Sequence, residues 1–149
     1  MSFEKDFDLP PETVFAYFAD HENLGSILGA KVTRIKDGDD GTLNGVGSVR
    51  RIKPPGPVPA FEETVTKSVP NDLIEYKVTK GTPLNHHLGT VYFSPTATGT
   101  HMKWDIEIGT RLPGLDVVIA KVLKKNIGDG LGKVTVPAWF SVVRGLVPG

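Results

Sequence analysis

The sequence contains no cysteine among its 149 residues. A disulfide framework, a thiolate metal site and a thiol nucleophile are therefore excluded. An excess of charge of one sign is also missing, because 17 Lys and Arg residues balance 17 Asp and Glu residues. No overall electrostatic field attracts nucleic acid or an anionic membrane surface, so we expect neither as a partner.

Long apolar runs are absent too. No stretch reaches the roughly 20 apolar residues that a membrane-spanning helix needs, and the acidic N-terminal stretch lacks the apolar core of a signal peptide. We therefore expect no membrane span and a cytoplasmic location. The chain length and a hydrophobic content of 39% favour a single globular domain with its own core.

Sequence motifs for several chemistries are missing as well. The sequence has no Gly-x-Ser-x-Gly elbow, no phosphate-binding loop and no dinucleotide-binding fingerprint after a strand. Its four histidines, His21, His86, His87 and His101, show no metal-ligand spacing. The basic residues are dispersed, without aromatic residues interleaved on one face. We therefore predict no metal ion, no cofactor and no nucleic-acid partner.

The most prominent feature that is present is a run from residue 113 to about 135, which predicts one long amphipathic helix. Its apolar residues recur at helical spacing and are Leu115, Ile119, Leu123, Ile127 and Leu131, with Val118, Val122 and Val134 widening the stripe. Lys121, Lys124, Lys125 and Asp129 fall on the opposite face. The second half contains Gly128, Gly130 and Gly132, which predict close packing or a kink there.

The residues before this run predict a β-rich body. A short strand over residues 2–9 is followed by a helix that begins at Pro11 and by a second helix over residues 21–28. Six strands with period-two alternation then follow, over residues 31–37, 45–53, 60–69, 73–79, 86–94 and 100–109. Their short links predict an antiparallel meander, which provides the large apolar surface that the long helix needs.

Five short segments carry a family resemblance. They are Ala-Asp-His-Glu-Asn-Leu at 19–24, Gly-Val-Gly-Ser-Val-Arg at 45–50, Phe-Glu-Glu-Thr-Val-Thr at 61–66, Pro-Asn-Asp-Leu-Ile-Glu-Tyr at 70–76 and Gly-Thr-His-Met-Lys-Trp at 99–104. With the order of the elements, they resemble the helix-grip fold of the START-like (SRPBCC) superfamily, and the polyketide cyclase/dehydrase-like branch most closely. The resemblance extends over nearly the whole chain to about residue 135.

The resemblance implies an α+β fold in which a curved antiparallel sheet of about seven strands wraps around the long C-terminal helix, with two short helices after the first strand. It also implies a ligand cavity between the sheet and that helix. Because the superfamily includes lipid carriers, cyclases, oxygenase domains and chaperone activators, the fold does not select one activity.

Period-two alternation then indicates which residues of the strands face this cavity. The predicted lining from the strands is Arg51, Phe61, Glu63, Val65, Ile74, Tyr76, His87, Val91, Phe93, Met102, Trp104 and Ile106, and from the helix Leu115, Val118, Ile119 and Val122. Glu63, His87 and Tyr76 are the candidates for catalysis. We expect either Arg50 or Arg51 to be the cation that partners a buried Glu63 carboxylate.

These residues favour binding of a small or medium hydrophobic molecule, such as a lipid, an aromatic compound or a polyketide-like compound. A cyclase or dehydratase with Glu63 or His87 as the acid or base and Tyr76 orienting the substrate is the alternative, so enzymatic activity is left open. A protein-interaction module is a second alternative. We expect residues 1–136 to form the domain and the apolar tail 137–149 to pack on it, or to present itself to a protein partner.

Overall fold

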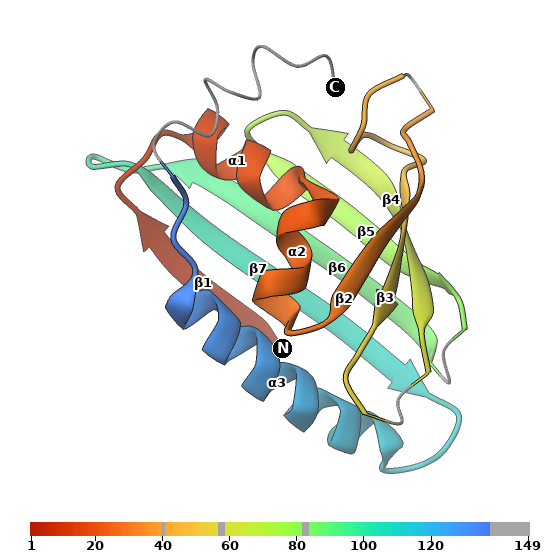
Figure 1. Cartoon of the computed structure of the whole chain (residues 1–149). Helices are drawn as coiled ribbons and strands as arrows, with labels where there is room; N and C mark the ends of the chain where they lie inside the picture. Colours follow the sequence, from red (N-terminus) through yellow and green to blue (C-terminus); the bar gives the residue numbers. More distant parts are fainter. Residues whose placement is uncertain (40, 57–58, 82–83, 138–149) are drawn as a thin grey trace.

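The computed structural model describes residues 1–39, 41–56, 59–81 and 84–137 (Figure 1). The elements are β1 (Ser2–Phe7), α1 (Pro11–Ala19), α2 (His21–Leu28), β2 (Lys31–Lys36), β3 (Val49–Lys53), β4 (Phe61–Val69), β5 (Leu73–Lys80), β6 (Leu84–Pro95), β7 (Thr100–Thr110) and α3 (Leu115–Lys133). Every predicted element is present. β3 begins later than predicted, because the chain before it turns at Gly47, which has a φ of 88°.

All seven strands form one sheet in the order β1-β7-β6-β5-β4-β3-β2, and every neighbouring pair is antiparallel. The six strands from β2 to β7 follow the chain order, so the predicted meander is confirmed. β1 adds to the free edge of β7, where Phe3 pairs with Trp104. The predicted α+β fold is therefore confirmed.

The short helices α1 and α2 cover one face of the sheet, which we call the inner face (Figure 1). α1 begins at Pro11. Proline suits this first position because a backbone N–H there would have no partner within the helix, and proline has no N–H. Asp20 caps α2 by accepting a hydrogen bond from the Glu22 backbone N–H at 3.2 Å. Phe15 and Phe18 of α1 meet Phe93 of β6, with ring centroids 5.4 and 6.1 Å apart. These aromatic contacts hold α1 on the sheet.

The inner face of the sheet carries the core. The buried apolar residues of the strands alternate as predicted and are Val65, Ile74, Tyr76, Val91, Phe93, Met102, Trp104 and Ile106. Between them, the outward residues of the same strands are more exposed. This period-two pattern is the signature of a sheet with one covered face.

α3 lies along the β1–β7 side of the sheet (Figure 1). Its bounds fall within the predicted run, but its burial differs from the prediction. Ile127 and Leu131 are buried, whereas Val118 and Val122 are 57% and 53% exposed. The prediction that these two valines widen a buried stripe is therefore wrong. The C-terminal part of α3 packs on α2, and no element of the described chain covers the two valines.

The glycines of α3 differ from one another. A Cβ placed on Gly130 would lie 1.8 Å from the backbone oxygen of Ile27, so only glycine lets α2 and α3 approach this closely. Nothing lies near the Cβ positions of Gly128 and Gly132. The helix runs through all three without a break. Gly130 therefore fulfils the expectation of close packing.

Two sequence-based expectations are not tested by the structure. Residues 138–149 lie outside the described part of the chain, so the packing of the tail 137–149 on the domain 1–136 stays a prediction, as does its contact with a protein partner. Within the described residues, no helix is both long enough and apolar enough to cross a membrane. The cytoplasmic location stays a prediction too.

Candidate ligand-binding site

A cleft of about 590 Å³ lies between the N-terminal half of α3 and the end of β7. This volume is in the range of small-molecule sites. The lining residues are Met1, Ile106, Glu107, Ile108, Asp116, Val117, Ala120, Lys121 and Lys124. Met1 is held at the cleft because its backbone oxygen accepts a hydrogen bond from the Ile106 N–H at 2.8 Å. The cleft thus combines apolar walls with charged residues.

The helix residues that line this cleft differ from those predicted. Leu115 and Ile119 are half-buried, Val118 and Val122 are exposed, and none of the four contributes to the cleft. The face of α3 that does so includes Val117 and Ala120. Of the strand residues predicted to line a cavity, Ile106 alone reaches the cleft, and the other buried ones pack in the core.

Next to the cleft, the inner face of the sheet carries a buried polar cluster. Arg50 and Glu63 are directly opposite each other on β3 and β4. The Arg50 Nε donates to Glu63 Oε1 at 3.0 Å, and both side chains are buried. The guanidinium carbon of Arg50 lies 4.8 Å from the centre of the Tyr76 ring on β5. Arg50 therefore neutralises the Glu63 carboxylate where water has little access.

Tyr76 is positioned by its neighbours on two strands. Its hydroxyl oxygen accepts a hydrogen bond from Trp104 Nε1 at 2.8 Å. Its ring occupies the space above Gly89, where a Cβ would lie 2.1 Å from the ring carbon Cζ. Burial raises the pKa of the Tyr76 hydroxyl, and the charge of Glu63 adds to this effect. Tyr76 therefore keeps its proton at neutral pH.

His87 on β6 completes the cluster. Its Nδ1 accepts a hydrogen bond from the Val78 N–H at 3.1 Å, and its Nε2 lies 3.9 Å from Glu63 Oε2. Burial lowers the pKa of His87, and Glu63 opposes this effect. At neutral pH the ring is therefore uncharged. Because Nδ1 accepts a hydrogen bond, the single ring proton is on Nε2 and points towards Glu63.

The structure brings two further polar residues to the cluster from the helical side. His21, at the start of α2, is 1% exposed and its Nε2 lies 3.3 Å from the hydroxyl oxygen of Ser48. Burial, followed by the positive charge of Arg50, lowers the pKa of His21 to about 3. Its Nδ1 is the one buried side-chain nitrogen or oxygen of the described residues without a hydrogen-bond partner. His21 is therefore a neutral residue close to Arg50.

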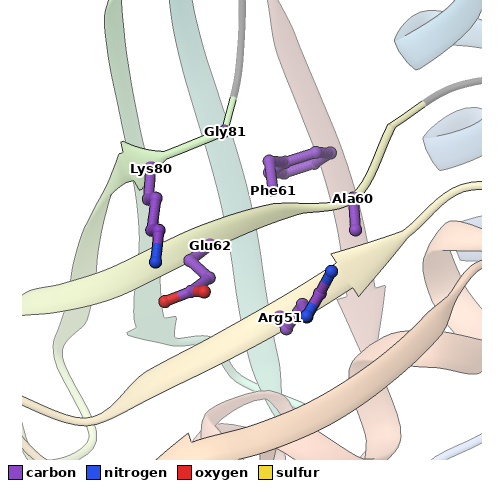
Figure 2. Close-up of a pocket in the computed structure, with 6 residues that line it drawn as sticks. All are labelled: Arg51, Ala60, Phe61, Glu62, Lys80 and Gly81. Atoms are coloured by element: carbon purple, nitrogen blue, oxygen red, sulfur yellow. The ribbon is translucent and has the colours of Figure 1, made fainter.

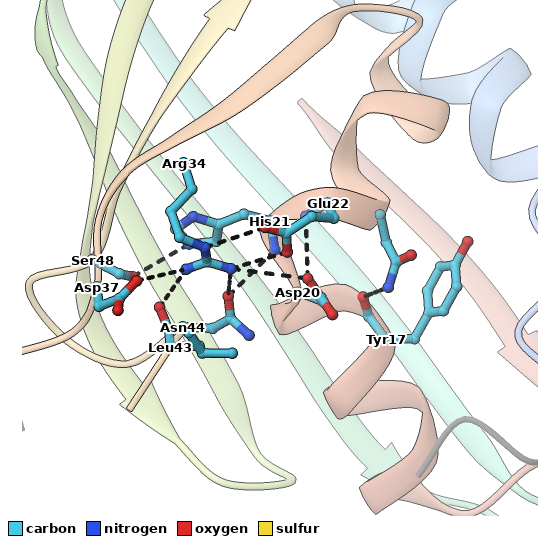
Figure 3. A network of polar contacts seen from close by, with 10 residues as sticks. Tyr17, Asp20, His21, Glu22, Arg34, Asp37, Leu43, Asn44 and Ser48 are labelled. Carbon is cyan, nitrogen blue, oxygen red and sulfur yellow. Dashed lines mark hydrogen bonds and ion pairs between the residues drawn. The ribbon is translucent and has the colours of Figure 1, made fainter. Parts of the chain in front are cut away.

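A network around Arg34 positions His21 (Figure 3). Arg34 on β2 donates to Glu22 Oε2 at 3.0 Å and to Asn44 Oδ1 at 2.7 Å, and it also binds the backbone oxygen of Leu43. The same Asn44 oxygen accepts the His21 backbone N–H at 3.4 Å. Arg34 thus links the start of α2 to the loop before β3.

Sequence reasoning missed two members of the cluster, His21 and Ser48. It named Arg50 as one of two possible partners of Glu63, and the structure shows that Arg50 is the partner. Arg51 was expected in the cavity, but it is exposed on the outer face and lines a groove of about 130 Å³ with Glu62 and Lys80 (Figure 2). That prediction is wrong, because side chains alternate along a strand and the buried Ile52 places Arg50 on the inner face with it. Phe61 also lines the outer groove and is partly buried against the core.

Ser48 and His21 gave weaker signals in the sequence. Ser48 lies just before β3, and His21 follows Asp20, the N-cap of α2. Neither position belongs to a strand, so only the fold defines where their side chains lie. Within the described residues, no three His, Asp or Glu side chains form a group able to hold a metal ion. The candidate site therefore has two sets of polar groups, the charged side chains that line the cleft and the buried cluster of Arg50, Glu63, Tyr76 and His87.

Comparison with known families gives one match. Residues 1–135 match the model of a family described as polyketide cyclase/dehydrase and lipid transport. The comparison with curated proteins gave no match. The family match spans every described helix and strand, so it applies to the domain as a whole.

Several solved structures are similar to this chain. The aromatase/cyclase Zhui from Streptomyces sp. R1128 is 17% identical, with a TM-score of 0.69 over 89% of this chain and 91% of that one. A truncated norcoclaurine synthase from Thalictrum flavum is 16% identical, with a TM-score of 0.66 over 89% and 90%. Protein CV1439 from Chromobacterium violaceum is 18% identical, with a TM-score of 0.66 over 92% and 96%. At these identities the likeness establishes the helix-grip fold alone.

Proposed function

Because this chain belongs to the polyketide cyclase/dehydrase and lipid transport family, we propose that it binds a small apolar molecule in the cleft between β7 and α3. The observation that carries the proposal is the cleft of about 590 Å³ itself, whose walls include Ile106, Ile108, Val117 and Ala120. Ile108 lines the cleft and is directly opposite His87 in the β6–β7 ladder. A molecule in the cleft therefore meets apolar walls and the charged residues that line it, which are Glu107, Asp116, Lys121 and Lys124.

Burial of apolar surface provides the affinity. Removing about 200 Å² of apolar ligand surface from water contributes roughly 5 kcal/mol at about 25 cal/mol per Å², from which the loss of translational and rotational freedom is subtracted. Ile106, Ile108, Val117 and Ala120 offer such a surface. Polar groups then decide which molecule fits, because an unpaired buried polar group is costly.

The proposal is tested by filling the cleft. Ala120→Phe places a ring among the lining residues, so the affinity for an apolar probe such as naphthalene should fall by about tenfold or more. Val118→Phe is the matched control, because Val118 is an exposed residue of the same helix that does not line the cleft. Calorimetric titration gives both affinities, and thermal unfolding checks that both variants are folded. Equal affinities for the two folded variants would contradict the proposal.

Enzymatic turnover is a second candidate function, which the Glu63–His87 pair favours. A neutral imidazole next to a carboxylate is a common acid/base arrangement, and here Glu63 Oε2 and His87 Nε2 lie 3.9 Å apart. Zhui is an aromatase/cyclase, so a cyclisation or dehydration of a polyketide-like substrate is the reaction to test. Glu63→Gln should then lower the rate by about a hundredfold or more while binding persists. A rate unchanged by this substitution would remove Glu63 from the reaction.

A further inference from the structure

The turn before α3 and the N-terminal half of that helix carry a cluster of exposed apolar residues. Four of the seven large apolar residues that are exposed in the described chain lie here, namely Leu112, Val117, Val118 and Val122. Each is at least 53% exposed, and α3 lies at an edge of the molecule (Figure 1). Exposed apolar residues that gather in one place mark a contact surface, whereas scattered ones are ordinary.

The same stretch is basic. Residues 111–125 contain Arg111, Lys121, Lys124 and Lys125 but only one acidic residue, Asp116, so their net charge is +3. All four basic residues are exposed, whereas Asp116 is half-buried. Within the described residues, none of the four forms an ion pair. We call residues 111–125 the basic apolar patch.

The valines and lysines of the patch are neighbours on the helix surface. Lys121 follows Val118 by three residues and Lys125 follows Val122 by three, and residues at this spacing lie side by side. A groove on a protein partner would bury the two lysines together with the valines, and burying an unpaired charge is costly. At a bilayer surface the valines enter the headgroup region, while the lysine stems lie along the apolar boundary and their ammonium groups reach the lipid phosphates.

Charge decides which partner fits the patch. A second copy of this chain brings the same net charge of +3 to the contact, so the two patches repel each other. Residues 138–149 contain Arg144 as their only charged residue, so they bring no negative charge either. The complementary partner is therefore apolar inside and negatively charged at its surface, as a bilayer with anionic lipids is.

We propose that the basic apolar patch docks on the surface of a membrane that contains anionic lipids. The balanced net charge of the whole chain predicts no such attraction, but salt screens exposed charges beyond about 8 Å, so the local excess at α3 acts alone. Val117, Lys121 and Lys124 belong to both the patch and the cleft, so the cleft borders the docked surface. The docking goes beyond the proposed function, because it does not depend on what the cleft binds.

The first test measures binding of the full chain to vesicles by co-sedimentation. Vesicles of equal parts of phosphatidylcholine and phosphatidylserine should bind the chain about a hundredfold more tightly than vesicles of phosphatidylcholine alone, because each unit of net positive charge near an anionic surface contributes about fivefold. Raising the ionic strength from about 0.1 M to about 1 M should remove most of this difference, because the screening length falls from about 10 Å to about 3 Å.

Variants then assign the binding to the patch. Arg111→Gln with Lys125→Gln removes two basic residues that do not line the cleft, and should weaken binding to the anionic vesicles by about 25-fold. Lys67→Gln with Lys77→Gln is the matched control, since both lysines are exposed on β4 and β5. It should change the affinity by less than about threefold, because these charges lie beyond the screening length from α3.

A second set of variants tests the apolar contribution. Val118→Ser with Val122→Ser should weaken binding to the anionic vesicles by about tenfold, because less apolar surface leaves water. Ile35→Ser, at a 50% exposed position of β2, is the control and should leave the affinity unchanged. Thermal unfolding checks that all variants are folded, since substitutions at exposed positions alter stability little.

A single label shows which surface meets the membrane. Because the sequence has no cysteine, Val118→Cys and Ile35→Cys each take one environment-sensitive fluorophore. On the anionic vesicles the emission should shift to the blue for the label at position 118 and stay unchanged for the label at position 35.

Four outcomes would overturn the inference. Equal binding to the two kinds of vesicle removes the role of charge, and binding unchanged by the patch variants places the contact elsewhere. Absence of binding to either kind of vesicle leaves the patch to a protein partner. A dimer, seen by light scattering, that Val118→Ser with Val122→Ser dissociates would assign the patch to a second copy. None of these outcomes affects the test of the cleft with naphthalene.

Discussion

The half of α3 with more apolar residues is the less buried one: residues 115–122 include six apolar residues and residues 126–133 include two. In the C-terminal half, residues 126–133, Ile127 is 1% exposed and packs with the core. In the N-terminal half, residues 115–122, three valines are more than half exposed and one of them lines the cleft. The helix is therefore anchored at one end and forms one wall of the cleft at the other.

Small residues and backbone contacts explain the anchored end. Gly130 allows the backbone of α2 to approach α3 at Ile27. Lys5 of β1 donates to the backbone oxygens of Leu131 and Val134, at 2.5 and 3.1 Å, where the last carbonyls of α3 lack partners in the helix. The N-terminal half has no comparable contacts within the described residues. The contacts that anchor α3 and the wall of the proposed binding site thus lie in different halves of one helix.

The largest expected effect comes from truncating the anchored half. Ile127→Ala should lower the free energy of unfolding by about 2 to 5 kcal/mol, because it leaves a cavity in the core. Val122→Ala should change it by less than about 0.5 kcal/mol, because the side chain is exposed. Denaturant unfolding of both variants measures the difference. Equal losses would show that both halves are packed alike.

The second effect uses two glycines of the same helix. Gly130→Ala should cost about 1 to 3 kcal/mol, because its methyl group overlaps the Ile27 backbone oxygen and one of the two helices must shift. Gly128→Ala should instead stabilise the protein by about 0.5 to 1 kcal/mol, because alanine favours the helix and nothing lies near its Cβ. Thermal unfolding gives both signs. Stabilisation by both substitutions would mean that α2 and α3 are not in close contact.

A smaller effect comes from the lysine at the end of the anchored half. Lys5→Met keeps an apolar stem but removes the charged donor, and should cost about 1 kcal/mol. Lys125→Met, an exposed position of α3 itself, is the control and should be nearly neutral. Hydrogen exchange of the backbone amides in the last turn of α3 should also become faster in Lys5→Met but not in Lys125→Met. Unchanged exchange there would remove Lys5 from the anchor.

The smallest effect depends on pH and acts on β1, the strand that supplies Lys5. His101 on β7 lies between Asp6 and Glu4 of β1, with Nδ1 and Nε2 at 2.6 and 3.0 Å from their oxygens. These two hydrogen bonds, Asp6 first, raise the pKa of His101 above its ordinary 6.5. The contribution to stability is therefore fully present below about pH 6.5 and is lost as the pH rises through the folded-state pKa.

The measurement compares the melting temperatures of the wild-type chain and His101→Gln at about pH 5.5 and about pH 8.5. The wild-type advantage should be larger at the lower pH, because the charged imidazole binds both carboxylates. The effect should be small, since His101 is exposed and salt screens its partners. An advantage that grows at the higher pH would contradict the raised pKa.

Much of the fold was predictable because it depends on local patterns. The alternation of apolar residues in β4 to β7 predicted which side chains are buried, and Glu63 and Tyr76 were placed on the inner face in this way. The same rule, applied to β3 through Ile52, would have selected Arg50 in place of Arg51. Arg51 was assigned to the cavity without this rule, and Arg50 was named only as a possible partner of Glu63.

The sequence by itself determined the elements, their antiparallel order and the inward residues of the sheet, since period and turn residues act over a few neighbours in the chain. The tertiary structure alone decided how α3 lies. Its valines repeat at helical spacing whether or not anything covers them. Which face is buried depends on contacts between residues distant in sequence, such as Gly130 with Ile27 and Lys5 with Leu131. Such contacts leave no periodic signal, because each joins one pair of positions only.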